Sequence, residues 1–297
     1  MVACTVLTWF GCASQRSARE TDSGDARLAR TTHLARAAWD KGSLAQAETL
    51  FRQAHRRARE LDDAAGLGDA AYNLAAVLIA RERLSEASPL LDESLAALER
   101  ANRPTVDVLL VKAKVAIAEQ RPDLALDWLD QVNQAPALLP AQRAQAALLR
   151  GEIAQRAKNV EEARRQLTEA RKQSVPGNPM LAAGIEKLSG AVALMEGDAA
   201  KAALAFDREA ELCRHARNPR AMAQALARAG DAFVQAGNPD AGADRLYRAA
   251  RSCLAQGDVP AARSLIDRGA ELAARSQDES LQSRLRELGR EAQAVTR

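Results

Sequence analysis

The chain has 297 residues, a formal net charge of +3 and 47% hydrophobic residues, but only 3% of its residues are aromatic. Alanine accounts for 67 residues, and ten prolines are present in the whole chain. This composition excludes a β-sandwich or β-barrel, because half-buried strands need β-branched and aromatic residues. It also disfavours disorder, since leucine and alanine recur at helical spacing along nearly the whole chain. We therefore expect closely packed helices.

The chain begins with an uncharged apolar run over residues 1–13, which a polar stretch follows. The run is too short to span a bilayer as a helix, but its length suits the apolar region of a signal peptide. The small residue Gly11 before Cys12 resembles the lipobox of bacterial lipoproteins. The resemblance implies that residues 1–12 are a leader, that Cys12 carries the lipid, and that residues 13–26 form a flexible tether.

Two features depart from the lipobox pattern. Trp9 stands where that family usually has leucine, and no lysine or arginine precedes the apolar run. A start codon assigned too far downstream would explain the missing basic residues. The alternative is an N-terminus that is disordered or packed as an apolar segment.

The next segment is basic, although the whole chain is nearly balanced, with 42 basic and 39 acidic residues. That balance argues against a dedicated nucleic-acid binder, which carries a large positive excess. Residues 26–60 contain eight arginines or lysines against three acidic residues. This local excess is either a solvated helix face or a surface for an anionic partner or a lipid.

From about residue 27 onward the chain repeats itself. A small residue recurs early in each second helix, followed four positions later by a large one. The segment Leu34 to Ala54 shows the pattern most completely and resembles the tetratricopeptide repeat, whose small residues let two antiparallel helices cross closely. The small-residue positions are Ala47, Ala87, Ala125, Ala163, Ala202, Gly242 and Ala262, separated by 38 to 40 residues except for a final spacing of 20.

The resemblance implies an all-α fold, a right-handed α-solenoid of about seven helix–turn–helix repeats plus a C-terminal capping helix, within one domain over residues 27–297. The final spacing of half a period indicates that residues 240–256 serve as the second helix of one repeat and the first helix of the next. Residues 276–295 carry leucines on one stripe and charges elsewhere, as expected of a helix that covers the end of the stack.

The predicted turns contain helix-capping residues. Glycine followed by a capping residue stands at the turns near 197, 237 and 257, and an Asn-Pro pair opens the helices near 178 and 218. Cys213 and Cys253 occupy the same position in successive repeats. Neighbouring helices in such stacks lie about 8–10 Å apart, whereas a disulfide needs Cα atoms within about 7 Å. We therefore expect two free thiols.

No catalytic constellation is present. His33, His55 and His215 are not spaced as metal ligands, and the chain contains no HExxH, CxxC, P-loop or GxSxG string. The sequence therefore predicts a protein that is not an enzyme, with no catalytic residue, no metal, no cofactor and no small-molecule substrate.

In proteins of the resembled family the first helix of each repeat lines a concave groove that binds a partner. Transferred by register, this property predicts ten partner-binding residues. Aromatic, aliphatic and oppositely charged side chains are mixed among them, which favours a peptide or protein over nucleic acid. Trp39 and Tyr72 are the expected anchors, because aromatics are scarce here and such residues often dominate interfaces; the alternative is that both serve inter-helix packing. The ten residues are Arg36, Trp39, Asp69, Tyr72, Ile79, Lys114, Glu152, Arg156, Lys187 and Asp231.

Two functional hypotheses follow. The first is a lipid-anchored scaffold on the periplasmic face of the outer membrane, because the layout of lipobox, tether and repeats resembles outer-membrane lipoproteins that assist the assembly of envelope machines. Ala13 after Cys12 is compatible with sorting to that membrane. The second is a cytoplasmic regulatory or signalling adaptor of the same repeat class, with a disordered N-terminus.

Overall fold

The computed structural model describes residues 25–275 and 278–295, which form fourteen α-helices and contain no strand. The all-α prediction is confirmed. The predicted leader over residues 1–12, including Cys12, and nearly all of the predicted tether lie outside the described residues. Across the described ranges, no helix is long and apolar enough to cross a membrane.

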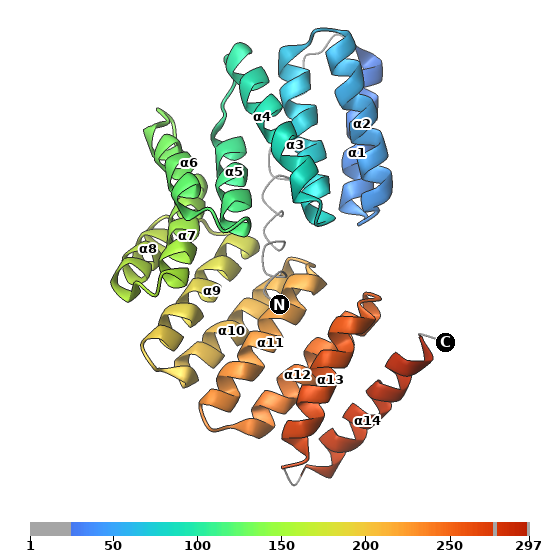
Figure 1. Ribbon diagram of the computed structural model, residues 1–297, viewed down its shortest axis with the longest axis vertical. Coiled ribbons are helices and arrows are strands. Elements are labelled where there is room, and N and C mark those ends of the chain that lie inside the picture. The colour runs from blue at the N-terminus through green and yellow to red at the C-terminus, as the bar shows by residue number, and fades with distance from the viewer. Residues whose placement is uncertain (1–24, 276–277, 296–297) are drawn as a thin grey trace. The chain divides into compact units, whose positions relative to one another are not determined.

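The described residues form two compact units, divided between residues 142 and 143. In each unit, consecutive helices run antiparallel and stack as hairpins (Figure 1). The prediction of one continuous domain over residues 27–297 stays a prediction. Unit 1 contains α1 (Ala26–Asp40), α2 (Leu44–Glu60), α3 (Ala64–Ala80), α4 (Leu84–Arg100), α5 (Val106–Ala118) and α6 (Pro122–Gln134). Unit 2 contains α7 (Pro140–Arg156), which begins just before the boundary, α8 (Val160–Lys172), α9 (Pro179–Met195), α10 (Ala199–His215), α11 (Pro219–Gln235), α12 (Pro239–Ala255), α13 (Val259–Ala273) and α14 (Glu279–Ala294).

The helix pairs cross at the small residues that the sequence predicts. All six alanines of the register have no exposed surface, and Gly242 is buried as well. A Cβ added to Gly242 would lie 2.6 Å from Cγ2 of Val234 and 3.0 Å from the carbonyl oxygen of Gly230. The backbones of α11 and α12 therefore lie almost in contact, and side-chain size is the requirement at this crossing.

The large residues four positions after the crossing fill the core, as predicted. Each of them is buried, and Phe51, Phe206 and Leu246 belong to core clusters that also contain side chains of the following helix pair. In unit 1 one core cluster joins all helices from α1 to α5. Its members include Ala38, Phe51, Leu74, Leu91 and Val108, one from each helix in turn. The seven large residues are Phe51, Leu91, Leu129, Leu167, Phe206, Leu246 and Ile266.

The turns end and restart the helices by recurring local means. One residue in each of eleven turns has a positive φ, which glycine adopts without steric cost. Glycine occupies five of these positions, but six carry other residues: Asp62, Glu82, Asn102, Gln120, Lys158 and Arg217. The predicted caps are confirmed, because each side chain accepts a hydrogen bond from the backbone N–H three residues later: Asn178, Asp198, Asn218, Asn238 and Asp258.

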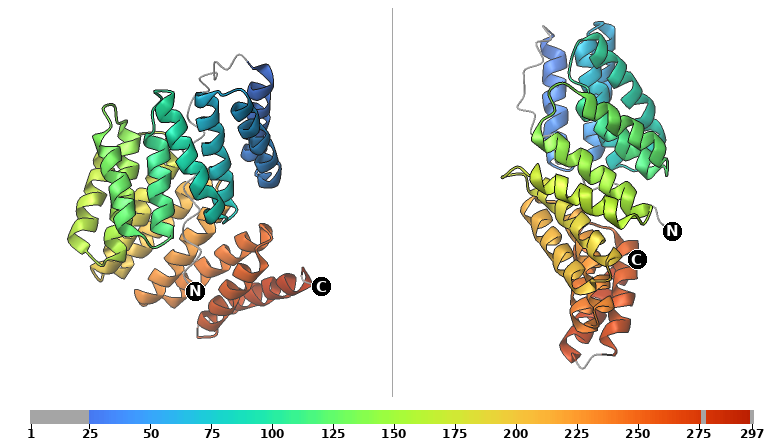
Figure 2. Two further views of the ribbon diagram at one scale, coloured as in Figure 1. Left: turned by 45° about the horizontal axis from the view of Figure 1, so that its top comes forward. Right: turned by 90° about the vertical axis from the view of Figure 1, so that its left-hand side faces the viewer.

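The C-terminal helix of unit 2 follows the prediction. Helix α12 packs against both α11 and α13, as α10 does with α9 and α11, so its sharing between two repeats stays a prediction. Helix α14 lies beside α13 (Figure 2, orange to red) and buries Leu281, Leu285 and Leu288 on one stripe. Cys213 and Cys253 are not joined by a disulfide, as expected, and Cys213 is buried.

Candidate functional site

The predicted aromatic anchors lie on the first two hairpins of unit 1. Trp39 on α1 and Tyr72 on α3 are both half-buried and pack against the same core cluster. The core therefore holds part of each ring while the remainder reaches the surface. Arg36 on α1 and Lys114 on α5 are half-buried as well. We call Arg36, Trp39, Asp69, Tyr72 and Lys114 together the unit 1 first-helix surface.

Asp69 on α3 has a defined electrostatic partner. Its carboxylate lies 4.0 Å from a guanidinium nitrogen of Arg103, which follows α4, and its side chain is 17% exposed. The pair links α3 to the connection between α4 and α5. A partner that contacts Asp69 must accommodate this arginine.

Ile79 does not belong to this surface. Its exposed fraction is 0%, and it lies inside the core cluster that joins α1 to α5. The prediction that Ile79 contacts a partner is wrong. The register placed Ile79 on a first helix correctly, but α3 is buried on nearly all sides over its C-terminal half, so position on a first helix does not ensure exposure there.

In unit 2 the predicted residues form a row of ion pairs. Glu152 and Arg156 on α7 are joined at 2.8 Å, and Nζ of Lys187 on α9 lies 3.9 Å from the same carboxylate. Asp231 on α11 pairs with Arg268 on α13. Burial raises the pKa of the Asp231 carboxyl in spite of this arginine. The first helices of unit 2 thus present charges of both signs that largely satisfy one another.

A buried pair in the same unit was missed by the sequence reasoning. Glu209 on α10 is 4% exposed, and Oε1 accepts a hydrogen bond of 2.6 Å from Nη2 of Arg228 on α11. Oε2 of Glu209 and Nε of Arg228 are buried without a hydrogen-bond partner in the described structure. Burial raises the pKa of Glu209, against the opposing effect of Arg228 and Lys187.

The repeat pattern in the sequence could have predicted this pair. Glu209 stands seven residues after Ala202, at a second crossing position where every other repeat carries a small or apolar residue. A glutamate there requires a cation from the next helix, because an unpaired buried charge is costly. The corresponding residues of the other repeats are Ala54, Ser94, Val132, Ala170, Ala249 and Gly269.

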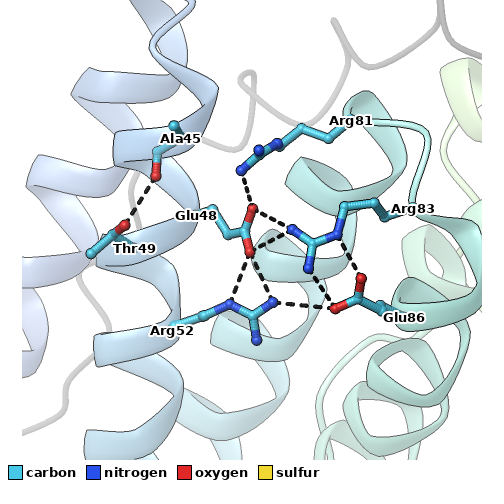
Figure 3. A network of polar contacts seen from close by, with 7 residues as sticks. All are labelled: Ala45, Glu48, Thr49, Arg52, Arg81, Arg83 and Glu86. Atoms are coloured by element: carbon cyan, nitrogen blue, oxygen red, sulfur yellow. Dashed lines mark hydrogen bonds and ion pairs between the residues drawn. The ribbon is translucent and has the colours of Figure 1, made fainter.

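A charged network connects the first two hairpins of unit 1 (Figure 3). The carboxylate of Glu48 on α2 accepts hydrogen bonds from Arg52 on the same helix and from Arg81 and Arg83 at the turn between α3 and α4. Glu86 binds Arg83 through two hydrogen bonds of 2.6 Å. Burial by itself raises the pKa of Glu48, but the arginines hold it below its ordinary value. The guanidinium groups of these arginines are thus already bound by carboxylates of the same chain.

Within residues 25–275 and 278–295, no group of three or more His, Cys, Asp or Glu side chains is placed to hold a metal ion. Burial, followed by the charge of Glu209, raises the pKa of the Cys213 thiol to about 12. A thiol with this pKa is almost fully protonated at neutral pH and is a poor nucleophile.

Comparison with known proteins agrees with the architecture. Residues 27–100 match the family model of the tetratricopeptide repeat. The fold is similar to that of BtubC (BKLC) from P. vanneervenii, with a TM-score of 0.56 and 17% identity over 72% of this chain and 92% of that chain. It is also similar to a chain in the APC/C hetero-tetramer Cut9-Hcn1, with a TM-score of 0.59 and 14% identity over 92% of this chain and 50% of that chain.

At these identities the likeness to solved structures shows the fold alone, and this chain spans half the length of its counterpart in the Cut9-Hcn1 assembly. No curated protein matches the sequence. Residues 27–100 match the tetratricopeptide repeat, and the later helices continue as hairpins with buried small residues at their crossings. The chain is an all-α protein of helical hairpins whose residues 27–100 are similar to tetratricopeptide repeats.

Proposed function

We propose that this chain is a non-enzymatic scaffold that binds a peptide or protein partner through its first helices. Repeats of this class suggest protein–protein interaction. The observation that carries the proposal is the placement of Trp39 and Tyr72. In a chain with 3% aromatic residues, both lie on the first helices of unit 1, held by the core and still partly exposed.

The charged residues predicted on the first helices of unit 1 indicate the kind of partner. Arg36, Asp69 and Lys114 carry both signs of charge on the unit 1 first-helix surface, so a polyanion meets repulsion as well as attraction there. An extended or helical peptide with an apolar side chain for the aromatic anchors and charges of both signs fits this arrangement. In unit 2, a partner must displace or bridge the existing pairs of Glu152, Arg156, Lys187 and Asp231.

Substitution of the anchors tests the proposal. Trp39→Ala and Tyr72→Ala are expected to weaken capture of a partner from envelope extracts, identified by mass spectrometry, while the helical content measured by circular dichroism stays unchanged. Trp128→Ala is the matched control, because Trp128 lies on the second helix α6, where Lys112 covers its ring at 4.1 Å. Unchanged capture by both anchor variants, or an equal loss in the control, contradicts the assignment of the anchors.

We further propose that the scaffold is lipid-anchored through Cys12 on the periplasmic face of the outer membrane and takes part in envelope assembly. The support is the sequence itself, the apolar run over residues 1–13 with Gly11 before Cys12. Incorporation of radiolabelled palmitate, its loss in Cys12→Ala and sensitivity of processing to globomycin are the expected results. No label on the wild-type chain, or equal label on Cys12→Ala, refutes the anchor and favours the cytoplasmic adaptor.

A further inference from the structure

We propose that the outer face of α1 docks on a membrane surface of anionic phospholipid. Arg27, Arg30 and Leu34 are exposed on α1, and Lys41 is exposed at its C-terminal end. Arg30, Leu34 and Lys41 stand three, seven and fourteen residues after Arg27. In a helix with 3.6 residues per turn, this spacing places all four on one side. The side of α1 that packs against the rest of unit 1 carries Leu28 and Ala35, and buried Ala38 marks the margin between that side and the basic one.

The cations of this face differ from most others in the segment because they are not neutralised. Arg27, Arg30 and Lys41 make no ion pair with any other described residue. By contrast, Arg57 on α2 binds Asp25 at 2.6 Å, and Arg59 binds a glutamate of α4. Three of the five cations of residues 26–60 that make no ion pair with another described residue therefore lie on this face, and the other two are Arg36 and Arg56.

The acidic groups near α1 do not cancel this charge. Asp25 caps the helix by accepting a hydrogen bond from the backbone N–H of Leu28, and Arg57 holds its pKa low. Asp40 is exposed near the C-terminal end of α1, so three cations face one acidic side chain. Leu34, with 49% of its surface exposed, stands between the cations. An apolar side chain flanked by arginine and lysine is suited to the boundary between lipid headgroups and acyl chains.

The docking face and the partner surface lie on opposite sides of α1. Arg36 stands nine residues after Arg27, which corresponds to two and a half helical turns and therefore to the opposite side of the helix. A membrane against Arg27 and Arg30 leaves Arg36 accessible. Docking through α1 thus orients unit 1 with its first-helix surface available to a partner.

The choice of a lipid as occupant rests on the proposed anchor at Cys12, whereas the basic face itself does not depend on it. The fourteen residues from Ala13 to Ala26 span at most about 50 Å when fully extended. A lipid on Cys12 therefore keeps α1 within that distance of the bilayer. At the resulting high effective concentration, a weak electrostatic contact is sufficient to hold the face against the membrane.

Vesicle sedimentation with the full-length Cys12→Ala chain tests the face without a covalent lipid. The chain is expected to bind vesicles containing about one third phosphatidylglycerol in phosphatidylcholine, and to bind pure phosphatidylcholine much less. Each cation near an anionic surface contributes roughly a fivefold change in partitioning. The triple variant Arg27→Gln, Arg30→Gln, Lys41→Gln is therefore expected to bind the phosphatidylglycerol vesicles at least about tenfold more weakly than the unmodified chain. Leu34→Ser is expected to weaken binding without a change of charge.

The matched control is a triple variant with the same change of net charge in unit 2, Lys172→Gln, Lys201→Gln and Arg290→Gln. All three control residues are exposed and make no ion pair with another described residue. The control is expected to bind phosphatidylglycerol vesicles like the unmodified chain, and binding by the unmodified chain is expected to fall as salt screens the charges. Circular dichroism checks that every variant keeps its helical content.

Several results overturn the inference. They are equal binding to the two kinds of vesicle, equal binding by the α1 variant and the unmodified chain, and an equal loss in the unit 2 control. Tighter binding of a single-stranded DNA oligonucleotide than of the vesicles, lost in the α1 variant, assigns the face to nucleic acid instead. Because the tested chain carries no lipid, none of these outcomes decides whether Cys12 is acylated, which the palmitate experiment decides separately.

Discussion

The two partners of the buried pair in unit 2 are expected to respond unequally to removal. Arg228→Met retains an unbranched side chain beside α10 but leaves the carboxylate of Glu209 buried with no cation bound to it. Glu209→Ala instead restores a small residue at a crossing position where other repeats carry alanine, and it leaves behind an arginine that is already partly exposed. The variant without the arginine is therefore expected to be the less stable one.

The magnitude follows from burial. Removal of one member of a buried pair typically costs about 3–5 kcal/mol. The side chain of Glu209 is 6% exposed and that of Arg228 is 25% exposed, so we expect about 3 kcal/mol for Arg228→Met. For Glu209→Ala we expect about 1 kcal/mol, because the arginine left behind is more exposed than the glutamate and alanine suits the crossing. In the double variant the cost is expected to stay near that of Glu209→Ala.

Urea denaturation followed by circular dichroism measures these free energies of unfolding. A raised pKa means that the folded state binds the proton of Glu209 more tightly than the unfolded state does, so stability falls as pH rises above the carboxyl's ordinary value of 4.5. Without Arg228 this pKa rises further. The destabilisation of Arg228→Met is therefore expected to be larger at pH 7 than at pH 5, while that of Glu209→Ala changes less.

Two results would refute this reasoning. One is an equal loss of stability in Arg228→Met and Glu209→Ala, which would mean that the uncompensated carboxylate costs nothing. The other is a loss in Arg228→Met that does not change between pH 7 and pH 5, which would show that packing and not the charge of Glu209 is responsible.

Three further predictions concern turns, the charged network and the thiols. Lys158→Gly, at φ +56°, is expected to stabilise the chain by about 0.5–1 kcal/mol in urea denaturation, and Gly197→Ala, at φ +82° with open space around the new Cβ, to destabilise it by about 1 kcal/mol. Glu48→Gln is expected to lower the free energy of unfolding by about 1 kcal/mol at pH 7, since the partners of Glu48 are partly exposed. The lowered pKa of Glu48 means that its contribution to stability is lost as pH falls below 4.5. The difference in stability between the variant and the unmodified chain should therefore shrink there. Iodoacetamide at pH 8 is expected to label Cys253 before Cys213, whose pKa of about 12 suppresses the thiolate, as peptide mass spectrometry will show.

The regular spacing of small and large residues along the chain predicted most of the fold. Ala47, Gly242 and their counterparts mark the helix crossings, and a leucine stripe predicts the amphipathic segment that became α14. These features are readable because close helix packing needs small side chains at fixed intervals, and local capping needs specific residue types. The left-handed conformation of Lys158 was harder to predict from the sequence, because residues other than glycine rarely adopt it and lysine does not indicate it.

The sequence by itself determined that the protein is an alanine-rich stack of helical hairpins, and it identified first helices on which partner-binding residues are expected. Tertiary structure decided which of those residues are accessible. Ile79 is enclosed because α3 is surrounded by neighbouring helices, whereas Trp39 remains partly exposed. It also brought Glu209 to Arg228 from a different helix. Periodicity describes one helix at a time, but burial and charge pairing depend on what the neighbouring helices supply.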